Sequence, residues 1–478
     1  MPIFLKSHKL YISKKNKYVR SDKMANTLNK KYGLPTAIAM VTGVVVGSGV
    51  FFKAEKILNA TGGDLKLGIV AWIIGGLIML ACAYAFSVLA NRIEKCNGLV
   101  DYAEAMVGKK YAYFIGWFTS VIYYPCLTMA LAWVTARYTC VLFFHDQADI
   151  TGGLCMTLAA FFLIFSFAIN LLSPIIAGKV QVSTTIIKLI PLFLMAIVGT
   201  IYGLTKGYTI ENFTTIVNEV DTGTALFVAI CATAFAYDGW IVATTINAEL
   251  KDAKKNLPRA LVFGSLAVII VYILYYVGLA GGITNAEMMA GGETGARLAF
   301  EAVFGKLGGT AVFVFVIISC FGTLNGLTLA CSRGMYALAA RNEGIKPHIF
   351  SQVDKATNMA PNSATIGLMM CIVWLVFFYC SQFSSFGSSW GIFAFDPTEL
   401  PIVTSYALYI PIFFMMMFKV KDAGISKRFF APLIAICGSS FMMIATIFSH
   451  RTYVIGYLII FAVINIIGMF FAKEKKKN

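Results

Sequence analysis

Long apolar runs dominate this sequence, and they constrain its fold more than any other feature. The stretch LGIVAWIIGGLIMLACAYAFSVLA, residues 67–90, carries no charged side chain. A helix needs about 20 apolar residues to cross a bilayer, whereas a membrane β-barrel would show alternating segments of about ten residues. The sequence therefore predicts an all-α integral membrane protein. Twelve runs are expected to form transmembrane helices, at about 36–58, 67–90, 111–142, 154–172, 180–203, 223–249, 259–282, 309–338, 362–380, 398–418, 429–448 and 453–472.

The composition and the placement of the charges agree with a membrane protein. Of the 478 residues, 59% are hydrophobic and 13% are charged, against about 25% charged in soluble domains. The net charge is +16, and 30 of the 39 Lys and Arg residues fall on one side of the predicted spans, with seven on the other. The positive-inside rule then predicts that both termini are cytoplasmic. We interpret the basic charge as facing anionic membrane lipid, which argues against nucleic acid as a partner.

The first run contains an unexpected group of glycines. In GVVVGSGVFF, residues 43–52, three glycines fall within seven residues, although each costs a helix interior about 1 kcal/mol relative to alanine. Unwound backbone survives inside a bilayer only where it lines a cavity or is buried in protein. A broken helix offers free N–H groups to an anion and free carbonyl groups to a cation. Together these groups could bind the polar part of a free amino acid.

A second interruption lies in the sixth run. In TAFAYDGW, residues 233–240, Asp238 and Gly239 interrupt apolar sequence, and a carboxylate at mid-membrane costs about 2.5–3.5 kcal/mol on insertion scales. Breaks in the first and sixth spans are typical of a five-plus-five inverted repeat that binds its substrate at the midplane. The alternative is that each glycine only allows close packing between helices.

Three stretches resemble a known transporter family. GVVVGSGVFF is similar to the helix 1 signature of the amino acid–polyamine–organocation superfamily. FAYDGWIVATTINAELKDAKKNLPRA (235–260) and FGTLNGLTLACSRGMYALAARNEG (321–344) resemble the L-type amino acid transporter family, in particular its bacterial serine/threonine exchangers. The resemblance implies a LeuT-like fold, with a 5+5 inverted repeat, broken helices 1 and 6 and two additional helices. It also implies a location in the bacterial cell membrane.

This organisation divides the chain into five segments. We expect a basic cytoplasmic tail at 1–32, a first five-helix repeat at 33–204 and a second at 205–418. Two more helices follow at 419–472, and a cytoplasmic tail occupies 473–478.

The resemblance also implies a substrate site at the two breaks. Backbone N–H groups of Ser48 and Gly49, with the Ser48 hydroxyl, would bind the substrate carboxylate. Phe235 would cover the substrate as a gate towards the outside. The residues expected to face the ammonium group, mostly through carbonyl groups, are Val45, Phe235, Ala236 and Asp238, and Val50 completes the set. Asp238 itself has two alternative roles: it selects the substrate side chain, or it caps the broken end of helix 6.

Lys188, in TTIIKLIPL of the fifth span, is a further candidate. The resemblance implies that its amine replaces a sodium ion beside the carbonyl groups of Gly43 and Val46 and the hydroxyl of Thr323. The alternative is a lysine whose amine reaches the cytoplasmic headgroups. Arg137 is expected to have an interfacial or packing role, and Tyr124 either lines the cavity or packs in the core.

The resemblance, together with the two breaks and Lys188, implies a sodium-independent exchanger of small neutral amino acids such as serine, threonine and alanine. A proton-coupled symporter, in which Lys188 releases a proton, and a cationic or broad-specificity carrier remain alternatives. A non-transporting amino acid sensor is an alternative of another class. Eleven cysteines and four histidines show no metal-ligand spacing, so we expect no metal, no cofactor and no enzymatic activity. No obligate protein partner is expected.

Overall fold

The computed structural model describes residues 33–47, 49–93, 98–144, 152–241, 251–357, 359–384 and 387–472. Within these ranges the regular secondary structure is entirely helical, which confirms the predicted fold class. Ten stretches are long and apolar enough to cross a membrane: Leu65–Ala90, Lys109–Phe143, Gly153–Leu172, Pro174–Lys206, Lys255–Ala280, Gly295–Ala340, Pro361–Gln382, Leu400–Lys419, Ser426–His450 and Tyr453–Phe470. The predicted number of twelve therefore stays a prediction.

The two predicted spans missing from these ten are the two in which the sequence predicts a break. The first run forms two helices of 12 residues each, α2 (Leu34–Val45) and α3 (Gly49–Ala60). In the sixth run α14 (Thr222–Ala236) stops at Ala236 and a turn follows. The remainder of that run, residues 242–250, lies outside the described residues. None of the three helices α2, α3 and α14 is long enough by itself to cross a bilayer whose apolar core is about 30 Å thick.

Backbone conformation and close packing explain where these helices stop. After α2, Val46 adopts an extended conformation with φ −65° and ψ 102°. Gly239, after α14, has φ +100°, a conformation that glycine adopts most readily. At Gly49 a Cβ atom would lie 2.6 Å from the Cα of Ala236, so glycine there allows α3 to approach the end of α14. The glycines thus serve both the breaks and the close packing that were considered as alternatives.

The helices of the two predicted repeats pack as counterparts. The first span packs on the sixth through α3 and α14, and the second on the seventh through α4 (Leu65–Ala90) and α15 (Ala253–Ala280). The third packs on the eighth through α7 (Tyr124–Phe143) and α17 (Gly295–Ala340). Each of these three spans of the first predicted repeat therefore contacts the span five positions later, as expected for two intertwined repeats.

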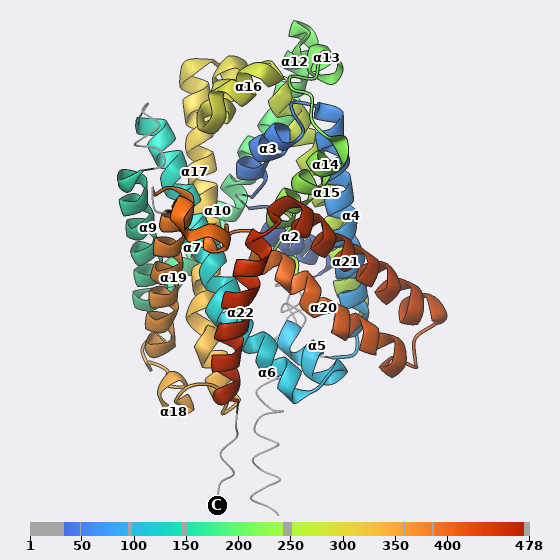
Figure 1. The fold of residues 1–478 in the computed structure, drawn as a ribbon, viewed down its shortest axis with the longest axis vertical. Coiled ribbons are helices and arrows are strands. Elements are labelled where there is room, and N and C mark those ends of the chain that lie inside the picture. The colour runs from blue at the N-terminus through green and yellow to red at the C-terminus, as the bar shows by residue number, and fades with distance from the viewer. Residues whose placement is uncertain are drawn as a thin grey trace, which may run out of the picture.

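The other elements complete the bundle around this centre (Figure 1). Other spans include α19 (Pro361–Gln382), α21 (Ala431–His450) and α22 (Tyr453–Phe470). In the most apolar 18-residue stretch of α22 only 22% of the residues are buried, against 83% in the corresponding stretch of Lys109–Phe143. Helix α22 is therefore peripheral. The remaining spanning elements are α6 (Lys109–Phe118), η1 (Thr119–Tyr123), α9 (Gly153–Leu172), α10 (Pro174–Ile187), α11 (Leu189–Leu194), η2 (Met195–Gly199), α12 (Thr200–Lys206), α20 (Leu400–Lys419) and η6 (Ser426–Phe430).

Short helices mark the two ends of the bundle in Figure 1. We call upper the end that carries α13 (Tyr208–Thr214) and α16 (Asn285–Gly291), and lower the end that carries α5 (Leu99–Met106) and α18 (Pro347–Phe350). Helix η4 (Gly292–Thr294) leads into α17, and η5 (Gly387–Phe393) precedes α20. Helix α17 begins well before the predicted residue 309, but Gly305 with φ 73° separates its first turns from the long span.

Candidate functional site

A cavity of about 270 Å³ lies between the two helix breaks. Its volume is just below the range of about 300–1,000 Å³ that is typical of sites for drug-sized ligands, so it suits a smaller molecule. The first, third, fifth, sixth and eighth spans contribute its lining: Gly43, Val45, Gly47, Gly49, Leu127, Leu131, Gln181, Lys188, Phe235, Ala236, Asp238, Gly239, Thr323, Gly326, Leu327 and Ala330.

The structure brings most of the predicted site residues to this cavity. Val45, Gly49, Phe235, Ala236 and Asp238 line it, as do Gly43, Lys188 and Thr323. Val46 and Val50 are fully buried but are not lining residues. Ser48 lies outside the described residues.

One tyrosine that the sequence did not single out joins the two breaks. The hydroxyl of Tyr272, on α15, lies 3.0 Å from the carbonyl oxygen of Val45 and 3.1 Å from that of Ala236. These carbonyl groups end α2 and α14, where helices lack intrahelical donors. The Tyr272 ring also packs against Trp72 and Tyr237, with centroid distances of 5.5 and 5.3 Å. Tyr272 therefore fixes the two broken ends relative to each other.

Asp238 is half-buried and is bonded to a side chain of another span. Its carboxylate accepts a hydrogen bond of 2.5 Å from the hydroxyl of Tyr123, on η1. Bonding to another helix of the protein is one way to stabilise a carboxylate at this depth. Tyr124, the predicted cavity residue, lines a second cavity, and its neighbour Tyr123 contacts Asp238.

Lys188 lies in the fifth span, as the single residue between α10 and α11. Pro191, three residues later, has no N–H group to offer to the carbonyl group of Ile187, which weakens the helix at this point. The Lys188 amine donates to the carbonyl oxygen of Gly43, and the side chain is only 3% exposed. Its burial does not fit an amine that reaches the headgroups.

Two of the predicted neighbours of Lys188 are not bonded to it in the described part of the chain. There, its hydrogen-bond acceptor is Gly43, and none is found at Val46 or Thr323. The Thr323 hydroxyl instead donates to the carbonyl oxygen of Ser319, at 3.1 Å. Thr323 nevertheless lines the same cavity as Lys188.

A second cavity lies beside the first, towards the lower end. It has a volume of about 430 Å³, and Gly326 and Ala330 of α17 line both cavities. Its other lining residues include Arg333, which is exposed, and Arg341, after α17. On its lower side the site therefore borders a cavity rather than a cluster of buried charges.

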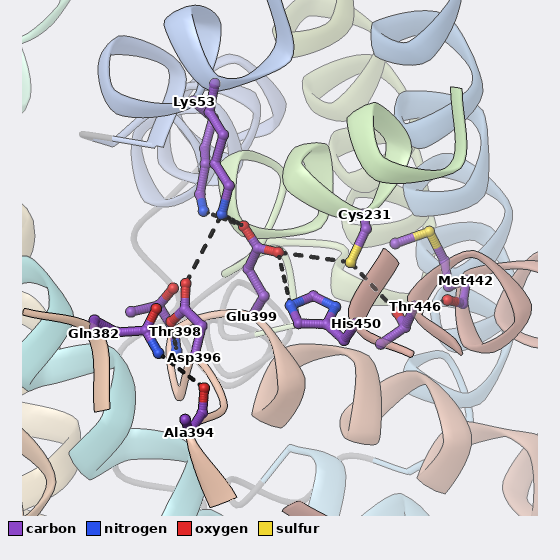
Figure 2. Close-up of polar contacts among 11 residues, drawn as sticks. Lys53, Cys231, Gln382, Ala394, Asp396, Thr398, Glu399, Met442, Thr446 and His450 are labelled. Carbon is purple, nitrogen blue, oxygen red and sulfur yellow. Dashed lines mark hydrogen bonds and ion pairs between the residues drawn. The ribbon is translucent and has the colours of Figure 1, made fainter. Parts of the chain in front are cut away.

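Towards the upper end the site is closed by a ring and a cluster of charges. Phe235 lines the cavity, and the amine of Lys53 lies 5.0 Å from its ring centroid. Oxygen Oε1 of Glu399 accepts from Lys53 at 2.5 Å and from Lys56 at 2.6 Å. Figure 2 shows this cluster, in which Asp396 lies 3.8 Å from the Lys56 amine. Lys53 and Glu399 are almost completely buried, so this face is tightly packed.

A further ion pair connects α3 to α7. Nitrogen Nη2 of Arg137 lies 3.6 Å from Oε2 of Glu55, and the guanidinium lies 5.3 Å from the Trp133 ring. Arg137 is 5% exposed. An interfacial or packing role was predicted for Arg137, and the ion pair with Glu55 was not.

Sequence reasoning missed these closing residues because the partners are distant in sequence. Lys53 and Glu399 are 346 positions apart, and no periodicity connects them. The sequence does contain one indication of this cluster. Asp396 and Glu399 directly precede an apolar run in FDPTELP, and Lys53 and Lys56 lie in the second half of the first run. Acids and bases at one membrane face are expected to pair.

Comparison with known proteins gives a consistent result. The amino acid permease family model matches residues 32–471. The serine/threonine exchanger SteT of Bacillus subtilis is 30% identical over 433 residues, covering 88% of this chain and 92% of that protein. The mouse b(0,+)-type amino acid transporter 1 is 24% identical, and the match covers 93% of this chain and 88% of that protein. The human large neutral amino acids transporter small subunit 2 is 28% identical, and the match covers 68% of this chain and 60% of that protein.

These relatives are amino acid transporters rather than enzymes. The matched region contains both helix breaks, the cavity between them and all ten apolar spans. The fold expected from the resemblance, the position of the cavity and the length of the match agree, and the chain belongs to the amino acid permease family of integral membrane proteins.

Proposed function

We propose that this protein exchanges small neutral amino acids of the serine, threonine and alanine class across the bacterial cell membrane, without sodium. The observation that carries the proposal is the cavity between the ends of α2, α3 and α14. The second cavity, on its lower side, is proposed to connect it to the lower surface, and buried charges close it from the upper end. A site open to one side only is what alternating access requires.

The proposed substrate cradle uses the ends of the broken helices. The first N–H groups of α3, including those of Gly49 and Val50, have no intrahelical acceptor and attract a carboxylate. The Ser48 hydroxyl is proposed to join them. Carbonyl groups at Val45, Phe235 and Ala236 are proposed to accept from the substrate ammonium. Phe235 would then separate the bound substrate from the upper end, as a gate.

The proposed independence from sodium rests on Lys188. Its buried amine already donates to Gly43 at the end of α2. A fixed cation at this carbonyl group supplies the positive charge that a bound sodium ion would bring. Val46 and Thr323 are proposed to approach Lys188 in another conformation of the cycle.

Asp238 is proposed to fix the broken end of helix 6 rather than to select the substrate side chain. Its carboxylate is already bonded to Tyr123, which leaves it less able to bind a cationic side chain. A small neutral substrate also suits the cavity volume of about 270 Å³. This reading disfavours the cationic carrier.

We propose an orientation with the lower end and both termini in the cytoplasm, following the excess of Lys and Arg on that side. The repeats are proposed to cover residues 33–204 and 205–418. We also propose that the chain works without an obligate protein partner, as a single-chain transporter. The human relative is named as a small subunit, so co-purification from the native membrane would test this point.

The decisive experiment is uptake of labelled serine by purified protein in liposomes. We expect uptake only when unlabelled serine, threonine or alanine is loaded inside, with equal rates in sodium and choline buffers. Protein-free liposomes and empty proteoliposomes are the controls. Uptake into empty vesicles driven by an inward proton gradient would instead support the symporter, and a rate that collapses in choline would refute the role of Lys188.

A competition assay tests the carboxylate cradle separately. Charge-assisted hydrogen bonds contribute about 1.5–3 kcal/mol each, so serine methyl ester should compete at least tenfold more weakly than serine. Equal inhibition by the ester would show that the anion site is wrongly assigned.

A further inference from the structure

Three potential metal ligands meet in the cluster that closes the upper end. They are the thiol of Cys231 on α14, the carboxylate of Glu399 before α20 and the imidazole of His450 at the end of α21 (Figure 2). Oxygen Oε2 of Glu399 lies 3.7 Å from Sγ of Cys231 and 3.5 Å from Nε2 of His450. All three ligand atoms lie within 4.8 Å of one another.

These separations are close to those of a zinc site. With Zn–S of about 2.3 Å and Zn–N and Zn–O of about 2.0–2.1 Å, tetrahedral geometry places ligand atoms about 3.3–3.6 Å apart. The two distances from Glu399 already approach this range, and the third, between Cys231 and His450, needs a contraction of at most about 1.2 Å. Sulfur, nitrogen and oxygen are the donor atoms that zinc binds in proteins.

The two oxygens of Glu399 have separate partners. Oε1 accepts from Lys53 and Lys56, whereas Oε2 faces the thiol and the imidazole. A metal ion at Oε2 therefore need not displace either lysine. Nδ1 of His450 is buried and has no hydrogen-bond partner among the described residues, so the ring can turn to present Nε2.

The charges also allow a divalent cation. Two lysines balance Glu399 and Asp396 in the cluster. On metal binding the Cys231 thiol would lose its proton to solvent and become a thiolate. The two positive charges of the metal ion would then be balanced by the thiolate and by one external hydroxide or chloride ion. That external anion would occupy the fourth position. The His450 side chain is 11% exposed and Lys56 41%, which gives an approach from the upper surface.

We propose that Cys231, Glu399 and His450 form a binding site for Zn²⁺ that is reached from the upper end. Because its ligands come from α14, α20 and α21, a bound ion links three elements that close this face. The expected consequence, which rests on the proposed function, is that external Zn²⁺ holds the closed conformation and inhibits exchange.

Cobalt binding to the purified full-length protein tests the site without any transport assay. Co²⁺ replaces Zn²⁺ in such sites and gives a thiolate-to-cobalt charge-transfer band with strong visible bands when tetrahedral. We expect saturable bands in the wild type that Zn²⁺ abolishes. Cys231→Ser should remove the charge-transfer band, and His450→Gln should weaken Co²⁺ binding at least tenfold.

Matched controls are Cys437→Ser, an exposed cysteine on α21, and His348→Gln, an exposed histidine at the lower end. Both should titrate like the wild type, and all variants should elute as single peaks in size exclusion. Absence of a band in the wild type, or a band that survives in Cys231→Ser, would overturn the proposal. If Cys231→Ser does not elute as a single peak, the His450→Gln titration alone decides, and unchanged affinity there overturns it.

The consequence for transport is tested in liposomes with Zn²⁺ added outside. Inhibition of serine exchange should be lost in Cys231→Ser and unaffected in Cys437→Ser. Equal inhibition in both variants would refute the link between the site and closure. If the wild type shows no exchange at all, the proposed function fails, whereas the cobalt result still decides the metal site.

Discussion

The two halves of the first membrane helix are held in opposite ways. The upper half, α3, is fixed by charges: Lys53 and Lys56 contact Glu399, and Glu55 contacts Arg137. The lower half, α2, contains no charged residue. It packs on α15 and receives hydrogen bonds from Tyr272 and Lys188 at its end.

This difference predicts which half moves more easily from the present conformation. Removing one member of a buried ion pair costs about 3–5 kcal/mol because it leaves a charge without a partner in a medium of low polarity. Apolar contacts have no fixed direction and exchange partners at lower cost. We therefore expect α2 to move while α3 stays attached, until water or substrate enters from the upper end.

The largest effect is expected where the two halves meet the sixth helix. In Gly49→Val the added side chain would overlap the backbone of Ala236, since even a Cβ would lie 2.6 Å from its Cα. Overpacking of about 3 kcal/mol would lower serine binding by about 100-fold. Binding of labelled serine to purified protein measures this. Gly178→Val, where a Cβ meets no atom within 4 Å, is the matched control; near-normal binding in Gly49→Val would contradict the predicted contact.

Loss of the amine at the end of α2 should have the next largest effect. Lys188→Ala removes a charged donor that contributes about 1.5–3 kcal/mol, so we expect exchange to fall by about 10- to 150-fold in a folded protein. Exchange rates and size exclusion check both statements. Lys179→Ala, an exposed lysine on the same helix α10, should be silent. A silent Lys188→Ala would mean that α2 does not depend on this bond.

Weakening the charges on α3 should open the upper end. We expect Lys53→Gln to increase alkylation of Cys231 by a membrane-impermeant maleimide about tenfold. The variant leaves the buried Glu399 carboxylate without one of its partners, and hydration of this carboxylate in an opened cluster recovers part of that cost. Peptide mass spectrometry measures the rate. Lys56→Gln, at a half-exposed side chain, should have a smaller effect and the exposed Lys66→Gln none. Equal rates in Lys53→Gln and Lys66→Gln would argue against a closing role.

The smallest effect is expected at Asp238. Asp238→Asn keeps an acceptor for Tyr123 but loses the charge. The difference between an ionic and a neutral hydrogen bond, about 1 kcal/mol, should reduce exchange of all substrates by about fivefold. Tyr123→Phe should act similarly, and Tyr124→Phe should have little effect. Competition against labelled serine provides the test; a selective loss of inhibition by arginine or lysine would show that Asp238 selects side chains.

The sequence by itself determined the fold class, the spans and the two breaks. Apolar length decides membrane insertion residue by residue, and glycines at 43, 47 and 49 weaken a helix through local backbone freedom. The motif GVVVGSGVFF and the charge of Asp238 were sufficient to predict that the breaks face a common site. These properties depend on neighbours along the chain, so the sequence contains them directly.

Only the tertiary structure decided which distant side chains share a space. Tyr272 joins Val45 and Ala236, and Glu399 meets Lys53 across 346 positions. Cys231, Glu399 and His450 come from three separate helices, so no spacing rule for metal ligands applies to them. Their proximity follows from how the helices pack and rotate about their axes, and a pattern along the chain fixes neither of these.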